Sequence, residues 1–265
     1  MKKRNPVKML TIVAASVLIL CIVGLRLVDV IAKSVLDSQV SAILGVEARV
    51  SGVSLGVLTS SSSFTGITIE NPPGFKEEYV LSIESATMDV GIGTLLSNDI
   101  EIPNIVLTGL TFDLEEVDKK INIEEVVNNI TAYSDAQPAT DTPTEVEIKT
   151  LHVHDLDLKA SGSIVTITGG HLETKVPDFT VKNIGTKSNP SKMSEQFVNV
   201  LMHAVLSHVF DHPIEGLSSV FTSSVKKAVY ELPKNFIEGG IKDIGNVLDS
   251  IKDGLLPGKP KPDSP

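Results

Sequence analysis

The feature that most constrains the fold is an alternating apolar pattern that changes phase at a fixed position. Between Gly45 and about Val181, apolar residues recur as apolar-x-apolar-x-x-apolar-x-apolar. Alternation is typical of a β-strand with one buried face, and the extra residue turns later side chains to the opposite face. A β-bulge or strand corner at that residue returns them to the core and adds twist. Two short strands joined by a tight turn would fit the same pattern.

The longest copies of this unit form an internal repeat. Ile100–Phe112 aligns with Val146–Leu158, and apolar residues fall at the same six places in each. Shorter copies begin at Ala48 and Leu81. We therefore predict an α+β fold in which residues 46–186 form a curved, mostly antiparallel β-sheet with bulged strands and one apolar face.

Turn and loop sequences separate these strands. Asn71-Pro-Pro-Gly-Phe75 cannot continue a strand ladder, because proline lacks the backbone N–H. Asn122 followed by Glu125 resembles a capping box and predicts a short helix over 123–130. Residues 132–144 are polar and contain proline, so we expect an internal flexible loop there. Because the strands on both sides share one pattern, this loop is not expected to be a domain boundary.

An uncharged run from Met9 to Leu25 follows a basic N-terminus. As a helix this run spans about 26 Å, and with Leu27 and Val28 it reaches the roughly 30 Å of a bilayer core. Basic residues before the run favour a cytoplasmic N-terminus. They are Lys2, Lys3, Arg4 and Lys8. We predict that residues 1–28 are a basic stub and a transmembrane signal anchor.

Two other interpretations of the N-terminus fit less well. A cleaved signal peptide needs a small-x-small site after the apolar run, and none follows Cys21. A bacterial lipoprotein needs a small residue before the lipidated cysteine, and Leu20 occupies that place. We therefore expect Cys21 to be a small, membrane-buried apolar residue.

Charge and composition exclude several function classes. Residues 29–265 hold 18 basic and 33 acidic residues, a net charge of −15 that argues against nucleic-acid binding and against broad adhesion to anionic lipid. Aromatic residues are 4% of the chain and tryptophan is absent, so a base-stacking platform is not expected. A single cysteine excludes an intrachain disulfide and a cysteine-built metal cluster.

Helical periodicity flanks the predicted sheet. Residues 29–45 carry apolar positions at helical spacing and are expected to form a juxtamembrane helix that ends at Gly45. Residues 193–252 form the helical C-terminal segment, with apolar stripes over 193–210, 214–230 and 236–251. We expect these helices to cover the apolar sheet face, with membrane-surface helices as the alternative. Residues 253–265 are expected to be a flexible tail.

Four strings in a fixed order after the predicted anchor carry a family resemblance. They are Leu44–Leu55, Phe64–Phe75, Leu95–Leu107 and Ile121–Val126, of which Gly-Ile-Thr-Ile-Glu-Asn-Pro-Pro-Gly-Phe is the most specific part. Together they resemble the N-terminal region of the AsmA-like family of bacterial envelope proteins, over residues 1–130 with a weaker echo at 146–186.

The resemblance implies an inner-membrane anchor, a periplasmic β-rich domain, and a role in lipid traffic or outer-membrane biogenesis. Large relatives look like hydrophobic-lined β grooves that bridge two membranes. Seven or eight strands at about 4.8 Å spacing give a sheet under about 40 Å wide, too small for that. A short lipid-holding or assembly module fits this chain better.

Motifs for catalysis are weak. Gly52-Val-Ser-Leu-Gly56 matches the nucleophile-elbow string, but that motif needs a strand, a sharp turn and a helix around Ser54. Here Val53 and Leu55 continue an alternating strand. We therefore predict no enzyme activity and no cofactor.

Histidine pairs with metal-ligand spacing also occur. His152 and His154 share one strand face, and His208 and His212 would share one helix face. Each pair would need a third ligand, for which the candidates are Asp155, Asp157 and Asp211. We interpret these histidines as partly exposed surface residues and predict no metal site.

The preferred hypothesis is a membrane-anchored periplasmic protein that holds or guides lipid, or assists envelope assembly, with phospholipid and envelope assembly proteins as candidate partners. The apolar surface that would face lipid comprises Ile102, Ile105, Leu107, Leu110, Leu151, Val153, Leu156 and Leu158. The alternative is a structural or protein-interaction scaffold with a filled core and no ligand. A hydrolase is a distant third. An unfilled apolar channel would indicate the first, and a filled core the second.

Overall fold

A computed structural model describes residues 29–56, 59–91, 94, 99–136, 145–185, 193–211 and 214–231 of the chain. The predicted anchor (1–28), the third predicted C-terminal helix (236–251) and the predicted tail (253–265) lie outside these ranges. Within them, no helix combines the length and the apolar composition needed to cross a bilayer.

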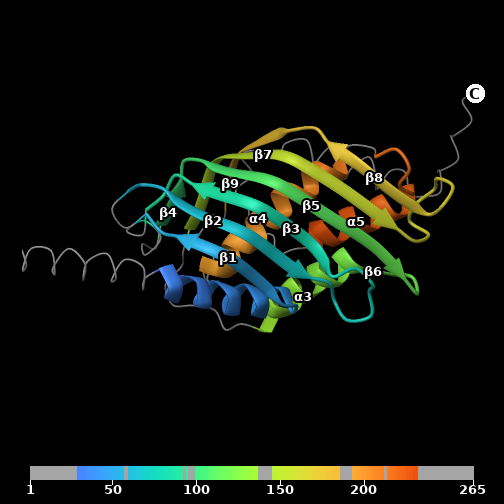
Figure 1. Cartoon of the computed structure of the whole chain (residues 1–265), viewed down its shortest axis with the longest axis horizontal. Helices are drawn as coiled ribbons and strands as arrows, with labels where there is room; N and C mark the ends of the chain where they lie inside the picture. The colour runs from blue at the N-terminus through green and yellow to red at the C-terminus, as the bar shows by residue number, and fades with distance from the viewer. Residues whose placement is uncertain are drawn as a thin grey trace, which may run out of the picture.

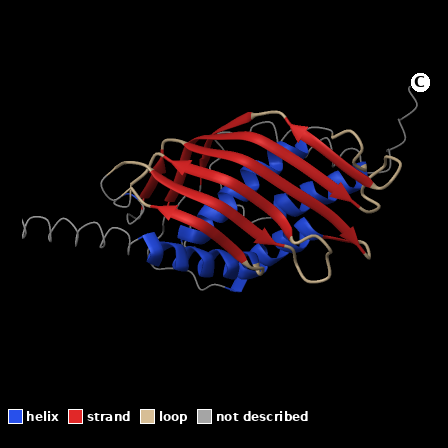
Figure 2. Cartoon of the chain, viewed as in Figure 1, coloured by secondary structure: helices blue, strands red, loops and turns tan. Residues whose placement is uncertain are grey.

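One large sheet forms one layer, and helices pack against one of its faces (Figures 1 and 2). The predicted α+β class is confirmed. The strands are β1 (Ala48–Ser54), β2 (Ser62–Glu70), β3 (Tyr79–Met88), β4 (Asp99–Ile102), β5 (Ile105–Val117), β6 (Lys120–Ile121), β7 (Glu145–Ser161), β8 (His171–Val176) and β9 (Phe179–Gly185). The helices are one over residues 29–44, α3 (Asn122–Ala136), α4 (Met193–Asp211) and α5 (Ser219–Glu231).

The sheet is six strands wide in the order β1, β2, β3, β5, β7 and then β8 or β9. The described part has nine strands, more than the seven or eight expected: two positions are divided along their length, and the two-residue β6 pairs with the end of β5. β4 and β5 follow one another along one side of β7, and β9 and β8 along its other side.

The residues at which the sequence pattern changes phase lie side by side on neighbouring strands, in one row across the sheet. Each position carries two consecutive outward residues between apolar ones, and we call this row the corner line. It comprises residues 51–52, 65–66, 84–85, 108–109, 154–155 and 177–178. Five strands continue through the corner line, as a bulge predicts, whereas Pro177 and Asp178 separate β8 from β9.

Backbone conformation explains which residues occupy the corner line. Gly66, Gly109 and Asp155 have φ of 57°, 67° and 51°, a left-handed region that favours glycine and, to a lesser degree, Asp or Asn. Space is also restricted, because a Cβ atom added at Gly109 would lie 2.5 Å from the Cγ atom of Glu84 on β3. The corner therefore depends mainly on backbone freedom, because the exposed side chain of Glu84 can move away from an added Cβ.

The two repeat copies pair side by side in the register of their sequence alignment. Ile105 pairs with Leu151, Leu107 with Val153 and so on along β5 and β7, a constant offset of 46 residues. This pairing and that of β4 with β7 are parallel, whereas the other pairings are antiparallel. Parallel neighbours need a crossover, and α3 lies within it.

We predict that Gly109→Ala lowers the free energy of unfolding by about 1–2 kcal/mol, the cost of left-handed strain, because the added Cβ meets only the exposed, flexible side chain of Glu84, which can move aside. Gly74→Ala is the matched control, because Gly74 also has positive φ (104°) but no atom within 4 Å of an added Cβ. It should cost only the strain, about 1–2 kcal/mol. Urea unfolding of the full chain in detergent micelles measures both. A much larger loss in Gly109→Ala than in Gly74→Ala would show that the Glu84 side chain cannot move aside.

The helix of residues 29–44, called the edge helix below, covers the free edge of β1 (Figure 1). The backbone N–H groups of Ala48 and Val50 donate to Ser41 Oγ and Asp37 Oδ1, each at 2.8 Å. Asp29 Oδ1 accepts from the N–H of Leu55 at 3.0 Å. Side chains thus satisfy edge amides that would otherwise be open to pairing with another chain.

We expect Asp37→Ala to raise hydrogen–deuterium exchange at the Val50 amide and to destabilise the fold by about 1–3 kcal/mol, because a partly buried N–H loses its acceptor. Asp37→Asn keeps an acceptor oxygen and removes only the charge that pairs with Lys33. It should therefore preserve protection of Val50. Faster exchange in both variants would assign the effect to the ion pair instead.

Two helices have bounds that differ from the sequence expectation. α3 extends to Ala136, through the first residues of the predicted 132–144 loop, and Tyr133 packs against the core. α5 begins at Ser219 rather than at 214. The preceding residues pair with the β7–β8 loop, where Thr166 N donates to Gly216 O and Ser218 N to Ile164 O, both at 2.8 Å. Ser218 Oγ then accepts from Phe221 N as the helix cap.

Candidate functional site

All eight apolar residues predicted to face lipid lie on the inner, helix-covered face of the sheet. They belong to β4, β5 and β7, and the corner line keeps them on that one face. Their exposed fractions range from 0% to 4% for Ile102, Ile105, Leu107, Leu110, Leu151, Val153, Leu156 and Leu158. They form part of one continuous apolar core.

Helix α4 closes this face. Val200, Leu206 and Val209 of α4 are buried in the core, and the helix contacts β7 and β9. The ring of His208 stacks on Phe179 of β9 with centroids 3.8 Å apart. On its other side α4 contacts α5, where Phe210 meets Phe221 edge-on at 5.8 Å. Sheet, α4 and α5 therefore share one packed interior.

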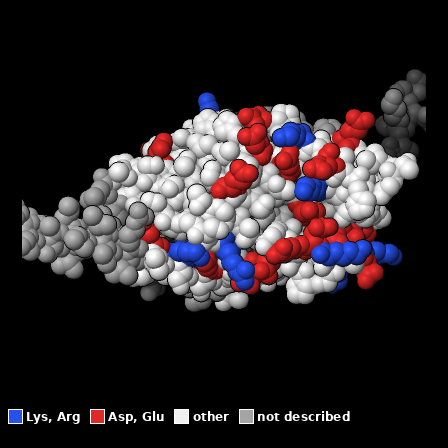
Figure 3. All heavy atoms as spheres, viewed as in Figure 1, with Lys and Arg blue, Asp and Glu red and all other residues white. Residues whose placement is uncertain are grey.

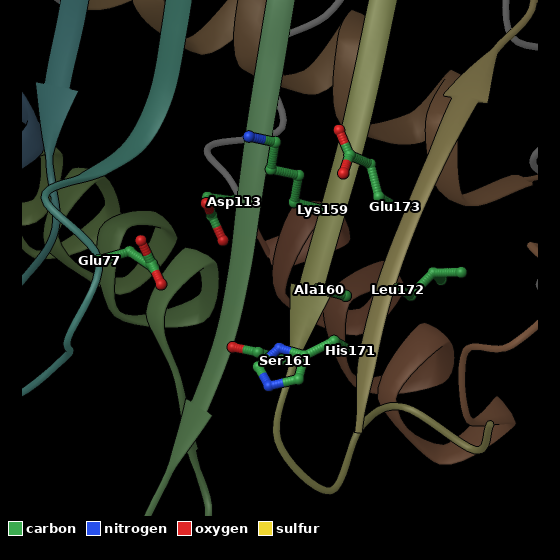
Figure 4. Close-up of a pocket in the computed structure, with 8 residues that line it drawn as sticks. All are labelled: Glu77, Asp113, Lys159, Ala160, Ser161, His171, Leu172 and Glu173. Carbon is green, nitrogen blue, oxygen red and sulfur yellow. The ribbon is translucent and has the colours of Figure 1, made fainter. Parts of the chain in front are cut away.

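Two cavities of the described part lie on the outer face and are lined mainly by polar side chains. One, of about 370 Å³, lies over the ends of β5, β7 and β8 (Figure 4). The other, of about 310 Å³, lies at the corner line around Gly109 and Asp155. Both are shallow and open, so they suit polar groups of a partner surface rather than an acyl chain.

The larger cavity is acidic. It is lined by Glu77, Asp113 and Glu173, with Lys159 as its one cation (Figure 4). Burial raises the pKa of the Asp113 carboxyl above its ordinary value, and the nearby Glu77 carboxylate adds to the effect while Lys159 opposes it. Across the described residues, no three or more His, Cys, Asp or Glu side chains are arranged to hold a metal ion.

His152 and His154 lie on the outer face of β7 and bind neighbouring strand residues. His152 Nδ1 is 2.9 Å from Thr180 Oγ1, and His154 Nδ1 is 2.7 Å from Asp178 Oδ2. Asp178 also accepts from the backbone N–H of Asp155, and these two hydrogen bonds lower the pKa of its carboxyl. The cluster therefore ties the break between β8 and β9 to the corner of β7.

The remaining candidates are dispersed. Ser54 is the exposed last residue of β1 and pairs with Ser63, so it does not sit at a strand-to-helix turn. His208 lies against Phe179 on the inner face. His212 and the side chain of Asp211 lie outside the described part.

The sequence reasoning missed a buried polar network beside α3. Glu115 is 3% exposed, and its Oε2 accepts from the N–H groups of Lys76 and Glu77. Asn122 accepts from Glu115 N at 3.0 Å and donates to Asn71 Oδ1 at 2.8 Å. Asn122 thus binds β5 and the turn rather than forming the expected capping box. The sequence pattern could not reveal this burial, because Glu115 falls at a polar place of the β5 alternation.

This network holds the Asn71–Phe75 turn, and Gly66 of the same string occupies the corner line. A sequence model of the AsmA family matches residues 1–207, more than three-quarters of the chain. The chain belongs to the AsmA family. The AsmA match confirms the resemblance that the motifs indicated. It also extends the similarity beyond residue 186 and into α4. Membership implies a protein of the bacterial envelope. Curated proteins and solved structures give no match.

A buried histidine should make this AsmA-family fold sensitive to acid. Burial lowers the pKa of His203 in α4 from its ordinary 6.5 to about 4. Between these values the unfolded chain binds a proton that the folded chain does not. The contribution of neutral His203 to the free energy of unfolding is therefore fully present above the ordinary pKa. It decreases as pH falls, by about 2 kcal/mol from pH 7 to pH 5.

Urea unfolding at pH 7 and pH 5 tests this. His203→Gln should remove most of the difference, whereas the exposed His171→Gln should leave it unchanged. Loss of the pH dependence in the His171 variant would place the sensitive group on the outer face.

Proposed function

We propose that this chain is a non-enzymatic scaffold of the bacterial envelope, anchored in the inner membrane by residues 1–28 with its β domain in the periplasm. Family membership supports the envelope location. The uncharged run Met9–Leu25, preceded by basic residues, supports a single span with a cytoplasmic N-terminus.

The observation that carries the scaffold role is the closed apolar core. A lipid-holding groove needs an apolar channel open between sheet and helices, with room for at least one acyl chain. Instead, the eight candidate side chains are 0–4% exposed on the helix-covered face, and the two outer-face cavities are polar. A filled core leaves the outer surfaces to carry the function.

The outer sheet face supports contact with protein partners. Over β2, β3 and β5 the corner line separates a part rich in charges from a part where uncharged side chains prevail (Figure 3). The latter part carries small polar side chains, among them Ser63, Thr65, Ser85, Thr87 and Thr108. Such a surface suits a partner protein better than lipid tails, because hydroxyl groups buried against acyl chains would have no hydrogen-bond partners.

Lipid holding remains a second candidate, because the cover over the apolar face comes from α4 and α5 rather than from the sheet. Lipid entry would then require α4 to leave β7 and β9. The stacked pair Phe179 and His208 marks the contact that would have to open.

Bridging that contact separates the two roles. Phe179→Cys and His208→Cys in a Cys21→Ser background would be joined by a short bis-maleimide in the full chain, purified in detergent micelles. We expect the bridged and unbridged forms to take up fluorescent phosphatidylethanolamine to the same low level and to co-purify with equal phospholipid, measured by mass spectrometry.

The two single-cysteine variants treated with the same reagent are matched controls, and lipid around the predicted span is common to all samples. Uptake by the unbridged form that bridging abolishes would contradict the scaffold role and support lipid holding.

A further inference from the structure

The outward face of the edge helix carries three exposed apolar side chains and no charge. Val30, Ile31 and Val35 are 63%, 62% and 53% exposed. The other exposed positions of this helix are uncharged: Ser34, Ser38, Gln39 and Ala42. Elsewhere in the described part, Ile167 is the one other large apolar side chain with such exposure. The patch is therefore local to the start of this helix.

The charged residues of the edge helix are used on its opposite side. Asp29 and Asp37 accept hydrogen bonds from the amides of Leu55 and Val50, and Lys33 pairs with Asp37 at 2.8 Å. These contacts fix the rotation of the helix against the sheet edge. The neutral, apolar side is thereby directed away from the domain.

The position of the patch along the chain identifies what covers it. Residues 9–28 span about 30 Å as a helix, the thickness of the hydrocarbon core. The next seven residues, 29–35, advance about 10 Å further, which is the depth of one headgroup layer plus its boundary. Val30, Ile31 and Val35 all fall in this interval, whereas the far half of the helix exposes Ser38, Gln39 and Ala42.

We propose that the first two turns of the edge helix lie in the headgroup layer of the bilayer, with Val30, Ile31 and Val35 against lipid. This inference rests on the membrane anchoring of the proposed function. A second copy of the chain is a poorer occupant, since three side chains offer a few hundred Å² against about 800 Å² per partner in a standard interface.

The placement orients the whole domain. Because Asp29 binds Leu55, the end of the sheet where β1 finishes lies at the membrane. The β7–β8 loop with Ile167 lies at the opposite end of the sheet, away from the bilayer (Figure 1). The outer sheet face is then steeply inclined to the membrane plane and is open to partners in the periplasm.

Spin-label accessibility of the full chain in liposomes tests this placement. Val30→Cys, Ile31→Cys and Val35→Cys, each in a Cys21→Ala background, would be labelled and reconstituted in phosphatidylethanolamine–phosphatidylglycerol vesicles. We expect collision with oxygen, relative to a water-soluble nickel chelate, to be several-fold higher at these positions than at Ala42→Cys and Ile167→Cys. The last two are controls on the same helix and at the far end of the sheet.

Flotation and urea washing of the same vesicles keep the two proposals distinguishable. If the chain stays with the vesicles but labels at Val30 and Val35 match Ala42, the headgroup placement is wrong while the anchor stands. If the chain does not float, the anchor itself is wrong. Spin–spin broadening at Val35 that disappears on dilution with unlabelled chain would assign the patch to a second copy and overturn the inference.

Discussion

The in-register parallel pairing of β5 with β7 is the constraint on which the other features depend. Both strands carry the same apolar unit, and a slip of one residue would turn the apolar set of one strand to solvent. Correct register places Gly109 beside Asp155, so that the two corners coincide. β3, β2 and β1 then continue the corner line, and one face of the sheet becomes the floor of a single core.

Polar contacts complete the sheet where hydrogen-bonded pairing ends. The edge helix supplies Ser41 and Asp37 to the free amides of β1, while Glu115 and Asn122 hold the turn that follows β2. Each replaces a missing strand partner by a side-chain acceptor, which avoids the cost of unpaired backbone groups. The most specific family string therefore encodes a corner and a fixed turn rather than a reactive group.

Because the core is closed, the surfaces of the domain are the places where partners can bind. Apolar side chains on the inner sheet face stabilise the fold by packing in one core with the helices, and so they give no direct access to lipid. Two surfaces have distinct chemistry. One is the outer sheet face, whose charges are concentrated on one side of the corner line over β2, β3 and β5 (Figure 3), and the other is the uncharged helix face next to the predicted span. Together they describe a domain held close to a membrane and open to proteins.

The sequence by itself determined the repeat unit, the single apolar face, the turn at Asn71–Phe75 and the family. These follow from local periodicity and backbone chemistry, which each segment carries alone. The tertiary structure decided that β5 and β7 run parallel, that Pro177 and Asp178 divide the last strand position, and that α5 starts after a turn bound to the β7–β8 loop. Alternation reports which face of a strand is apolar but neither the direction of its neighbour nor what covers that face. Leucine, isoleucine and valine are the same letters in a filled core and in a lipid groove, so only packing could tell them apart.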